Sequence, residues 1–433
     1  MSLQDTVAAA RQNSARLTQT NIDRLVDEIG DANYVLLGEA SHGTSEYYVW
    51  RSRITAKLID EKGFSFVGVE GDWPDCYRIN RYVSGETDKD AYDVLSEFER
   101  WPQWMWANWE VHEFVDWLRR YNAKHDTDVG FYGLDVYSLF DSMERVVEYL
   151  EDVDPEAAEE ARKAYACFEP YSENAREYSR SLRMVPETCE DEVVEILSHL
   201  EERQSEYVGR NHESFFDAEQ NALVAKKAEE YYRSLTRGGK ESWNVRDRHM
   251  TETAERLVDY HSEDEDANAK AVIWAHNTHV GDARATDMPD RGRINLGQLI
   301  RERNPDEDVE VVGFGSHHGD VIASSSWGET WKEMAVPKAK QDSYEDVFYE
   351  AGGDFILDTD SHVFDEERGH RAIGVVYNPR REAGNYVPTS LSNRYDYFVF
   401  LGETDSLNPI RTEETEEYEP ETYPWGSEAT YPM

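Results

Sequence analysis

"VLLGEASHGTSEYYVWR", residues Val35 to Arg51, is the stretch that decides the fold of this chain. Its apolar start ends at Gly38, a short polar turn with Glu39 and His42 follows, and apolar residues then recur at helical spacing. A buried strand that turns into an amphipathic helix is the repeating unit of α/β proteins. Glu39 and His42 serve either to satisfy the backbone of a capped turn or to form one wall of an active site.

The same strand signal recurs along the chain. Short apolar runs, rich in β-branched and aromatic residues with little polar alternation, are typical of strands buried on both faces of a parallel sheet. They span residues 33–39, 64–72, 129–135, 271–277, 309–315, 371–377 and 397–403. Residues 46–62 and 109–121 carry apolar side chains at helical spacing, and Gly63 closes the first of these helices. The pattern predicts an α/β fold with a mostly parallel central sheet flanked by helices.

A long segment without strand signals interrupts this alternation. Residues 141–262 are rich in Glu, Ala, Arg and Tyr at helical spacing, and strand-like runs resume after them. We therefore expect one α/β domain over residues 1–403 with a large helical insertion at about 141–262. Residues 404–433 are acidic and contain proline, which predicts a mostly extended C-terminal tail.

The net charge of −45 is the most unusual bulk property. Acidic residues are spread over the whole chain, and 33 of its 45 basic residues are arginines. Such a surface repels itself unless salt screens it, which predicts a salt-rich cytoplasm such as that of halophilic archaea. The charge argues against nucleic acid and anionic membranes as partners.

Cysteine usage and hydropathy restrict the class of protein further. Cys76, Cys167 and Cys189 are widely spaced without a C-x-x-C pair, so we expect neither a disulfide framework nor a zinc site. The chain has no run of 18 apolar residues, so no membrane-spanning helix is expected, and its N-terminus has no apolar signal region. These features predict a protein of the reducing cytoplasm, with its oligomeric state open.

Polar residues with reactive side chains follow the predicted strands. In open parallel sheets ligands bind beyond the carboxyl ends of the strands, so we expect these residues to converge on one edge. They are Glu39, His42, Glu70, Asp72, Asp135, His276, Asn277, His279, His317 and His318. Arg51 joins them, because helical side chains lean toward the helix N-terminus and Arg51 can reach back to the turn that carries His42.

Two of these segments also have a purely structural interpretation. Asp72 stands two residues before Pro74, and this spacing is typical of an aspartate that caps the N-terminus of a helix. The segment "SHHGD", which holds His317 and His318, is interpreted equally well as a loop or as a support of the site.

The residue set suits general acid–base catalysis on water. A neutral imidazole takes a proton from water, a carboxylate orients the ring, and an arginine stabilises a developing oxyanion. The same groups also suit a divalent metal ion. The chain lacks H-E-x-x-H, so it is not a zincin, and it lacks the G-x-S-x-G motif of serine hydrolases. It also lacks the two phosphate-binding loops G-x-x-x-x-G-K-[ST] and G-x-G-x-x-G. Direct attack by activated water is the remaining simple hydrolytic mechanism.

Several segments together resemble the erythromycin esterase family. They are "LLGEASHGTSEYYVWR", "VGVEGDWPDCYRINRYV", "WPQWMWANWEVHEFVDWLR", "FYGLDVYSL", "WNVRDRHM", "IWAHNTHVGD" and "RAIGVVYNP", in the family's order over roughly residues 20–405. The resemblance implies an α/β protein with added helices. Characterised members of that family open a macrolide lactone ring by hydrolysis, without a metal ion or a serine nucleophile.

The resemblance also implies roles for particular residues. His42 would be the general base on the hydrolytic water, and Arg51 would stabilise charge or orient Glu70. The residues that would place the water and the substrate are Glu39, Glu70, His276 and His279. We expect further substrate contacts from Asp135, Asn277, Trp106 and Arg246. The implied partner is a small-molecule ester or lactone, and no cofactor is expected.

Two other functions remain open beside the metal-independent esterase. A metal-dependent hydrolase of peptides or amides would use the same His and carboxylate set with a divalent cation. A protein that binds a small ligand without turnover would use the same pocket, although it has no need for a complete acid–base set. The natural substrate stays open in each case.

Overall fold

The computed structural model describes residues 3–171, 178–179, 181, 188–208, 211–235, 239–262 and 269–410. The chain divides into two compact units. The first unit holds the residues up to Val69, Ile79–Phe131, and the residues from Ala254 onward, and the second holds Glu70–Arg78 and Tyr132–Thr253. The chain therefore enters the second unit twice, once for a short segment and once for a long one.

A mostly parallel sheet forms the centre of the fold. Among the described residues nine strands join it, in the order β1-β8-β11-β6-β2-β5-β3-β4, with β7 paired to β6. The strands are β1 (Ser14–Arg16), β2 (Tyr34–Leu37), β3 (Phe66–Asp72), β4 (Gly130–Asp135), β5 (Ala271–Trp274), β6 (Val309–Ser324), β7 (Trp331–Val336), β8 (Phe355–Asp358) and β11 (Tyr397–Thr404). Neighbours from β11 through β6, β2 and β5 to β3 run parallel, whereas β1, β7 and β8 pair antiparallel. The predicted sheet is confirmed, and its antiparallel strands were not foreseen.

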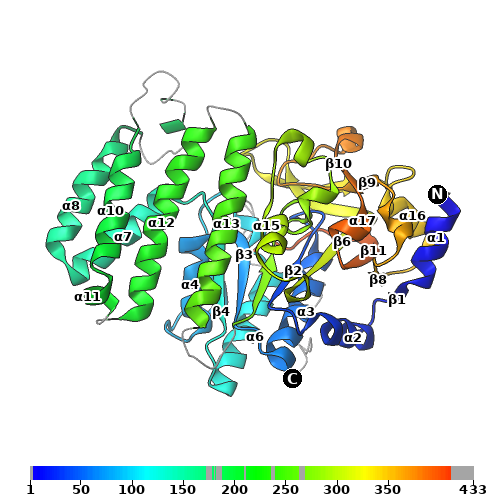
Figure 1. Ribbon diagram of the computed structural model, residues 1–433, viewed down its shortest axis with the longest axis horizontal. Helices are drawn as coiled ribbons and strands as arrows, with labels where there is room; N and C mark the ends of the chain where they lie inside the picture. The colour runs from blue at the N-terminus through cyan, green and yellow to red at the C-terminus, as the bar shows by residue number, and fades with distance from the viewer. Residues whose placement is uncertain are drawn as a thin grey trace. The chain divides into compact units, whose positions relative to one another are not determined.

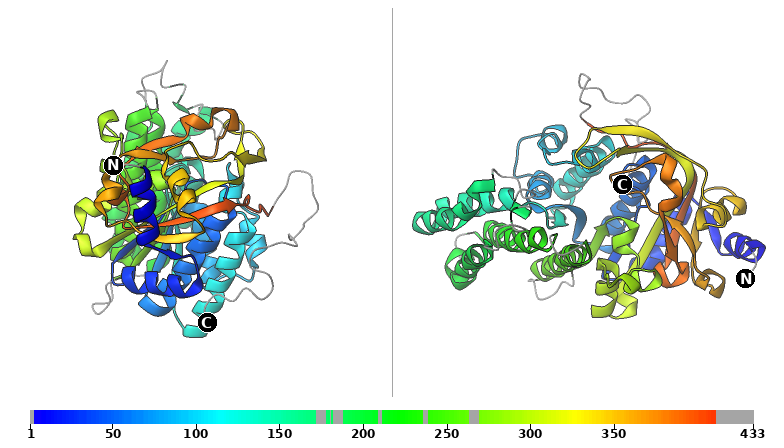
Figure 2. Two further views of the ribbon diagram at one scale, coloured as in Figure 1. Left: turned by 90° about the vertical axis from the view of Figure 1, so that its right-hand side faces the viewer. Right: turned by 90° about the horizontal axis from the view of Figure 1, so that it is seen from above.

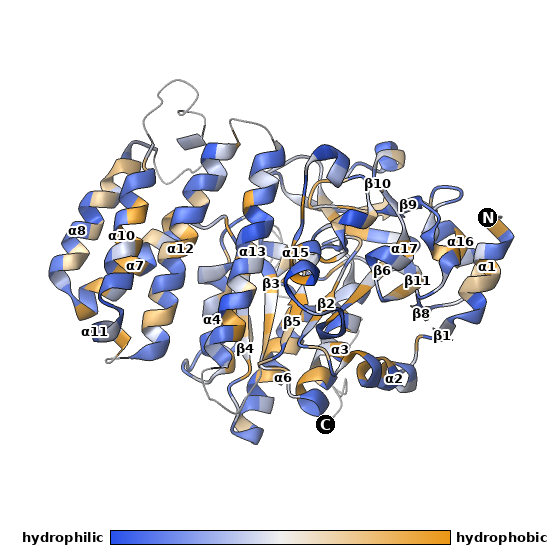
Figure 3. Ribbon diagram, viewed as in Figure 1, coloured by the Kyte–Doolittle hydropathy of each residue, from blue (hydrophilic) through white to orange (hydrophobic). Residues whose placement is uncertain are grey.

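The inner strands are apolar because both of their faces are covered. All four residues of β2 and all four of β5 are buried. In register, Leu37 lies beside Trp274 of β5 on one side and beside Val312 of β6 on the other. Figure 3 shows β2 and β5 in the hydrophobic colour, while the helices carry both colours. Continuous apolar runs therefore mark these strands, as the sequence predicts.

Two helices of the first unit carry clear local signals. Helix α3 (Ser45–Lys62) ends at Gly63, whose φ of 70° is the left-handed conformation that glycine adopts without strain. Helix α6 (Trp109–His125) begins where the Asn108 side chain accepts a hydrogen bond from the Val111 backbone. The other α-helices of this unit are α1 (Leu3–Gln12), α2 (Gln19–Ile29), α5 (Ala91–Leu95), α14 (Asn277–Val280), α15 (Leu296–Arg303), α16 (Tyr344–Ala351) and α17 (Leu391–Arg394).

The second unit is built mainly of helices. They are α7 (Leu139–Val153), α8 (Pro155–Tyr165), α10 (Glu190–Glu202), α11 (Gln204–Val208) and α12 (His212–Ser234), with the first parts of α4 (Trp73–Val83) and α13 (Gly239–His261). Helix α7 packs on α8 and α12, and α10 packs on α12 (Figure 1). Buried side chains such as Val146, Leu150, Leu200 and Ala225 form their core. The described residues between 141 and 262 are mainly helical, as the sequence predicts, and the single domain over 1–403 stays a prediction.

Residues 371–377 do not form a strand of the central sheet, which corrects the prediction. Strand β9 (Arg368–Arg371) ends where that run begins, and it pairs with β10 (Tyr386–Thr389) in a separate two-stranded sheet. The following residues make only isolated bridges, in which Ile373 meets Ser41. Val376 is 39% exposed, so the run lacks the cover on both faces that a central strand has.

The "SHHGD" segment lies inside a strand, so its interpretation as a loop was wrong. Strand β6 continues through His317 and His318 to Ser324, where it pairs with β7. Figure 2 shows this long strand leading into β7 within the first unit. Gly319 adopts a φ of 143° and has no side chain to collide with the Thr404 backbone, which explains how the strand passes this point.

Two cysteines are paired, against the prediction. Cys167 and Cys189 form a disulfide with their Cα atoms 6.0 Å apart. Cys189 directly precedes α10, and Cys167 lies just after α8, so the packing of α8 on α10 brings them together. Cys76 is free and buried. Spacing along the chain carries no signal for such a pair, because the contact is made by tertiary packing.

The last described residues return to the first unit. Thr44 forms a bridge with Ser406, and the Leu407 backbone donates a hydrogen bond to the Gly43 carbonyl. Residues 411–433, the larger part of the predicted acidic tail, lie outside the described residues. In the part of the chain that is described, no helix is long and apolar enough to cross a lipid bilayer.

Candidate active site

The turn after β2 is held on several sides by backbone contacts. The Gly43 carbonyl accepts hydrogen bonds from the Ile322 and Leu407 backbones at 3.0 and 2.9 Å. A Cβ atom at Gly43 would overlap the Ile322 carbonyl, and one at Gly38 would overlap the Asn277 amide. Glycine is therefore required at both positions by close packing, and the turn has one defined course.

Within this turn, Glu39 orients His42. The Nδ1 atom of His42 lies 2.8 Å from Oε1 of Glu39, and both side chains are buried. A carboxylate accepts a hydrogen bond, so the contact places the ring proton on Nδ1 and leaves the lone pair of the neutral ring on Nε2. The Tyr48 hydroxyl donates to the His42 carbonyl at 3.0 Å and so fixes the backbone as well.

Arg51 reaches back to the turn, as the sequence predicts. Its Nη2 atom lies 2.6 Å from Oε2 of Glu39, so the carboxylate lies between His42 and Arg51. The guanidinium is fully buried and stacks over the rings of Tyr48 and Trp274 at 4.4 and 5.1 Å. Cation–π contacts and the ion pair together stabilise a charge in a dry environment.

His276 lies beside His42. The two rings are 5.0 Å apart between centroids and inclined by 46°. The Nδ1 atom of His276 accepts a hydrogen bond from the Thr278 backbone at 3.2 Å, so a neutral His276 carries its proton on Nε2. His279 follows in α14 and is buried. The structure thus brings the base candidate and a second imidazole together, with opposite ring atoms protonated.

Asn277 contacts the surrounding protein through both its backbone and its side chain, and its predicted substrate contact stays a prediction. Its backbone donates to the Glu39 carbonyl at 2.8 Å. Its fully buried amide donates to the Phe314 carbonyl at 2.6 Å and lies 3.1 Å from Nε2 of His370. Both amide N–H groups are therefore directed at protein atoms.

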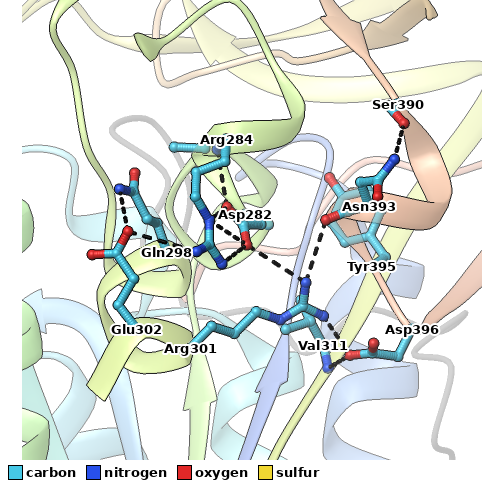
Figure 4. Close-up of polar contacts among 12 residues, drawn as sticks. Asp282, Arg284, Gln298, Arg301, Glu302, Val311, Ser390, Asn393, Tyr395 and Asp396 are labelled. Atoms are coloured by element: carbon cyan, nitrogen blue, oxygen red, sulfur yellow. Dashed lines mark hydrogen bonds and ion pairs between the residues drawn. The ribbon is translucent and has the colours of Figure 1, made fainter. Parts of the chain in front are cut away.

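An ion-pair network anchors the chain that follows α14 (Figure 4). The Asp282 carboxylate accepts from Arg284 at 2.6 Å, and Arg301 lies 3.7 Å from it. Arg301 also pairs with Asp396 at 2.6 Å. The Asp282 backbone donates to the Arg394 carbonyl at 3.2 Å. The segment that carries His276 is consequently tied to α15 and α17 at its far end.

A second polar cluster lies within the second unit. Nη2 of Arg246 lies 2.6 Å from Oε1 of Glu70 and 2.7 Å from Oδ2 of Asp135, and the guanidinium stacks over Tyr137 at 4.9 Å. Burial alone would lower the pKa of Arg246, but the two carboxylates outweigh it and raise this pKa. Arg246 is thus the ionic partner of Glu70, while the partner of Arg51 is Glu39. Substrate contacts by Asp135 and Arg246 stay predictions.

Two other predicted groups lie in the first unit. Trp106 is buried and packs edge-to-face on Tyr48, with centroids 6.1 Å apart, so it supports the residue that holds the His42 carbonyl. Its predicted substrate contact is untested. His317 stacks on Tyr349 at 3.8 Å, and burial first, then His318, lowers its pKa to about 4. His317 is therefore neutral at physiological pH.

Glu110 of α6 also supports the turn, although nothing in the sequence points to it. Its Oε1 atom accepts from the Ser45 hydroxyl at 2.5 Å and from the Asn408 amide at 2.8 Å. Burial raises the pKa of Glu110 to about 7. No local pattern marks this residue, because its partners come from positions far away along the chain.

The described residues contain no group of three or more His, Cys, Asp and Glu side chains arranged to hold a metal ion. Nδ1 of His42 faces Glu39, and Nδ1 of His276 accepts from Thr278. The metal-dependent alternative stays a prediction that a chelator tests.

Comparisons with known proteins agree with this architecture. The family model for erythromycin esterase matches residues 59–404. Erythromycin esterase type II of Escherichia coli is 29% identical over 134 residues, which is 30% of this chain and 30% of the relative. The putative hydrolase YbfO of Bacillus subtilis (strain 168) is 21% identical over 322 residues, which is 70% of this chain and 69% of the relative. Glu39, His42 and Arg51 precede the matched range of the family model.

Solved structures share the fold at low sequence identity. A Bacillus cereus protein superposes with a TM-score of 0.80 at 20% identity and covers 95% of this chain and 100% of its own. A succinoglycan biosynthesis protein gives 0.76 at 19% identity, covering 94% and 98%. An erythromycin esterase mutant in its open conformation gives 0.67 at 16% identity, covering 92% and 96%. These similarities establish the fold of the chain.

Proposed function

The chain belongs to the erythromycin esterase family, and on that premise we propose that it is a hydrolase that cleaves an ester or lactone with water activated by His42. The observation that carries the proposal is the 2.8 Å contact between Nδ1 of His42 and the Glu39 carboxylate. This contact leaves Nε2 as the basic atom of the neutral ring. A ring oriented in this way is suited to take a proton from water.

The first step is attack of water on the carbonyl carbon. Nε2 of His42 takes one proton from the water as its oxygen bonds to that carbon. The imidazolium that forms keeps its Nδ1–H directed at Glu39, whose negative charge stabilises it. We assign Arg51 to holding Glu39, because its guanidinium is fully buried and paired with that carboxylate.

The second step is collapse of the tetrahedral intermediate. A neutral His276 has its proton on Nε2, which suits it to donate a hydrogen bond to the oxyanion. The bond to the leaving oxygen then breaks, and that oxygen receives the proton held by His42. An acid and an alcohol result, joined in one molecule when the substrate is a lactone. We assign His279 to placing water and substrate, and the role of Glu70 stays a prediction.

The first experiment is turnover of a panel of lactones and simple esters in high KCl, with and without EDTA. Wild type is compared with His42→Ala and with the matched control His362→Ala, since His362 has a fully exposed side chain. The expected result is EDTA-insensitive hydrolysis that is lost only in His42→Ala. Full activity of a folded His42→Ala variant would refute the assignment of the base.

Other outcomes point to the alternatives. Activity lost on EDTA treatment and restored by a divalent cation would place the same side chains in a metal site. Stabilisation by a compound that is never turned over would favour a binding protein.

A further inference from the structure

We propose that Glu345 and His370 are positioning residues of this site, which hold the Asn277 amide and thereby set His276 against His42. Neither residue belongs to the predicted site, and neither lies near it in sequence. The kinetic consequence rests on the proposed hydrolase function. The positional consequence does not, because it concerns only where Asn277 and His276 lie.

The connection is a continuous chain of short contacts. Oε1 of Glu345 lies 2.5 Å from Nδ1 of His370 and also accepts from the Arg371 backbone at 2.8 Å. Nε2 of His370 lies 3.1 Å from the amide nitrogen of Asn277. All three side chains are buried, with at most 1% of their surface exposed. In such an environment each polar group requires a partner of the right kind.

The chemistry of these groups determines which atom donates and which accepts in each contact from Glu345 to Asn277. The Glu345 carboxylate accepts, so the His370 proton lies on Nδ1 and the lone pair of Nε2 accepts from the Asn277 amide. The second amide N–H donates to the Phe314 carbonyl at 2.6 Å. The other ring tautomer, or a protonated ring, would direct an N–H at the Asn277 N–H. The amide orientation therefore depends on the His370 tautomer, and this depends on Glu345.

The protonation states agree with that scheme. Burial lowers the pKa of His370, and the neighbouring carboxylate offsets only part of this effect. Burial opposes ionisation of Glu345, but its bonds from His370 and Arg371 outweigh it, so its pKa falls below the usual value. The Asn277 contact needs a neutral imidazole whose Nδ1–H faces an acceptor, and the Glu345 carboxylate supplies that acceptor.

Asn277 joins the two turns that carry the reactive histidines. It directly follows His276, and its backbone donates to the Glu39 carbonyl at 2.8 Å. The Gly38 backbone lies so close to the amide that a Cβ there would overlap it. A rotated amide therefore displaces one turn or the other. Displacements of about 1 Å at a catalytic group cost on the order of 100-fold in rate.

The decisive variant is His370→Phe, which keeps an aromatic ring and removes the acceptor for Asn277. Tyr344→Phe is the matched control, because Tyr344 is buried next to Glu345 on α16 and its hydroxyl bonds backbone groups of other segments, at Phe364, Glu366 and Leu391. Glu345→Gln is the conservative variant, since its amide oxygen still accepts from His370. Crystal structures, melting temperatures, kcat and KM are measured for all three.

The expected result has two parts. In His370→Phe the Asn277 amide rotates, the His42–His276 separation departs from 5.0 Å, and kcat falls about 10- to 100-fold with KM within about threefold. Tyr344→Phe loses stability but keeps its kcat, and Glu345→Gln keeps both the geometry and most of the activity. A general loss of stability would lower the melting temperature of the control as well, without this split.

Other results would overturn the proposal. It fails if Asn277 and His276 keep their positions in His370→Phe and kcat matches that of Tyr344→Phe. If His370→Phe does not fold, Asn277→Ser breaks the same link with a smaller side chain, and an unmoved His276 there has the same meaning. If wild type hydrolyses none of the compounds, the proposed function fails while the crystal structures still decide the positioning role.

Discussion

Nη2 of Arg51 lies 2.6 Å from Oε2 of Glu39, while the other oxygen of that carboxylate lies 2.8 Å from His42. One carboxylate thus connects a buried cation to the candidate base. Loss of its charge would release the His42 ring and leave the Arg51 charge uncompensated in a dry environment. This relationship makes Glu39 the most informative residue after His42.

Glu39→Gln is expected to lower kcat by about 100-fold or more, because an amide stabilises the imidazolium far less than a carboxylate does. The measurement is the pH dependence of kcat together with the melting temperature. Glu61→Gln is the control, since Glu61 is also paired with a cation, Lys57, but its side chain is partly exposed near the end of α3. Unchanged kcat in a folded Glu39→Gln variant contradicts the mechanism.

Glu110 predicts a pH dependence of stability. Its pKa is raised by burial from 4.5 to about 7, so the folded protein retains a proton that the unfolded chain has lost. The free energy of unfolding should therefore fall as pH rises from about 4.5 to about 7, by at most about 3 kcal/mol from this group. Glu110→Gln removes that contribution, so the variant gains stability over wild type at pH 8 and not at pH 4.5.

Urea unfolding at constant KCl at these two pH values provides the check. The pKa of Glu46 is also raised to about 7, mainly by burial, so wild type keeps some of the slope in either case. The difference between wild type and Glu110→Gln isolates the contribution of Glu110. Parallel pH profiles for the two proteins would show that Glu110 is ionised in the folded state.

Chelation should leave hydrolysis unchanged. His42 and His276 both direct Nδ1 at protein partners, and the proposed chemistry uses water and these side chains alone. The measurement is initial rate after dialysis against EDTA, with Zn²⁺ or Mn²⁺ added back in a parallel sample. A rate that falls on chelation and recovers with either ion would favour the metal-dependent hydrolase.

Salt should stabilise the protein. The net charge of −45 produces self-repulsion that is screened over roughly 8 Å at 0.15 M salt and roughly 3 Å at 1 M. The melting temperature should therefore rise between 0.2 and 2 M KCl, and NaCl at the same ionic strength should produce a similar rise. A melting temperature that is independent of KCl would remove the argument for a salt-adapted protein.

Local signals in the sequence were enough to predict the elements around the site. The unbroken apolar run before Gly38 predicts β2, and the apolar stripe that ends at Gly63 predicts α3. The same logic places Glu39 and His42 in the intervening turn and lets Arg51 reach it. Each of these features depends on residues within a window of about 18 positions, so a short stretch of sequence contains it.

Other elements depend on contacts that no short window contains. The edge strand β1 and its neighbour β8 are short and pair antiparallel with partners far along the chain. The apolar run at 371–377 has the pattern of a central strand, but it forms only isolated bridges, at Ser41 beyond the end of β2 and at Ser324 at the end of β6. The hydrophobic pattern of a segment indicates how deeply it can be buried, but it does not identify the strand with which the segment pairs.

The sequence by itself determined the α/β architecture, the family resemblance and the reactive turn with Glu39 and His42. Only the tertiary structure decided that the Asn277 amide meets His370, that His370 in turn meets Glu345, and that Arg246 pairs with Glu70. The physical reason is the distance along the chain between the residues that interact. Secondary structure follows from neighbouring residues, whereas a buried polar group is satisfied by whatever partner the packed chain brings within about 3 Å.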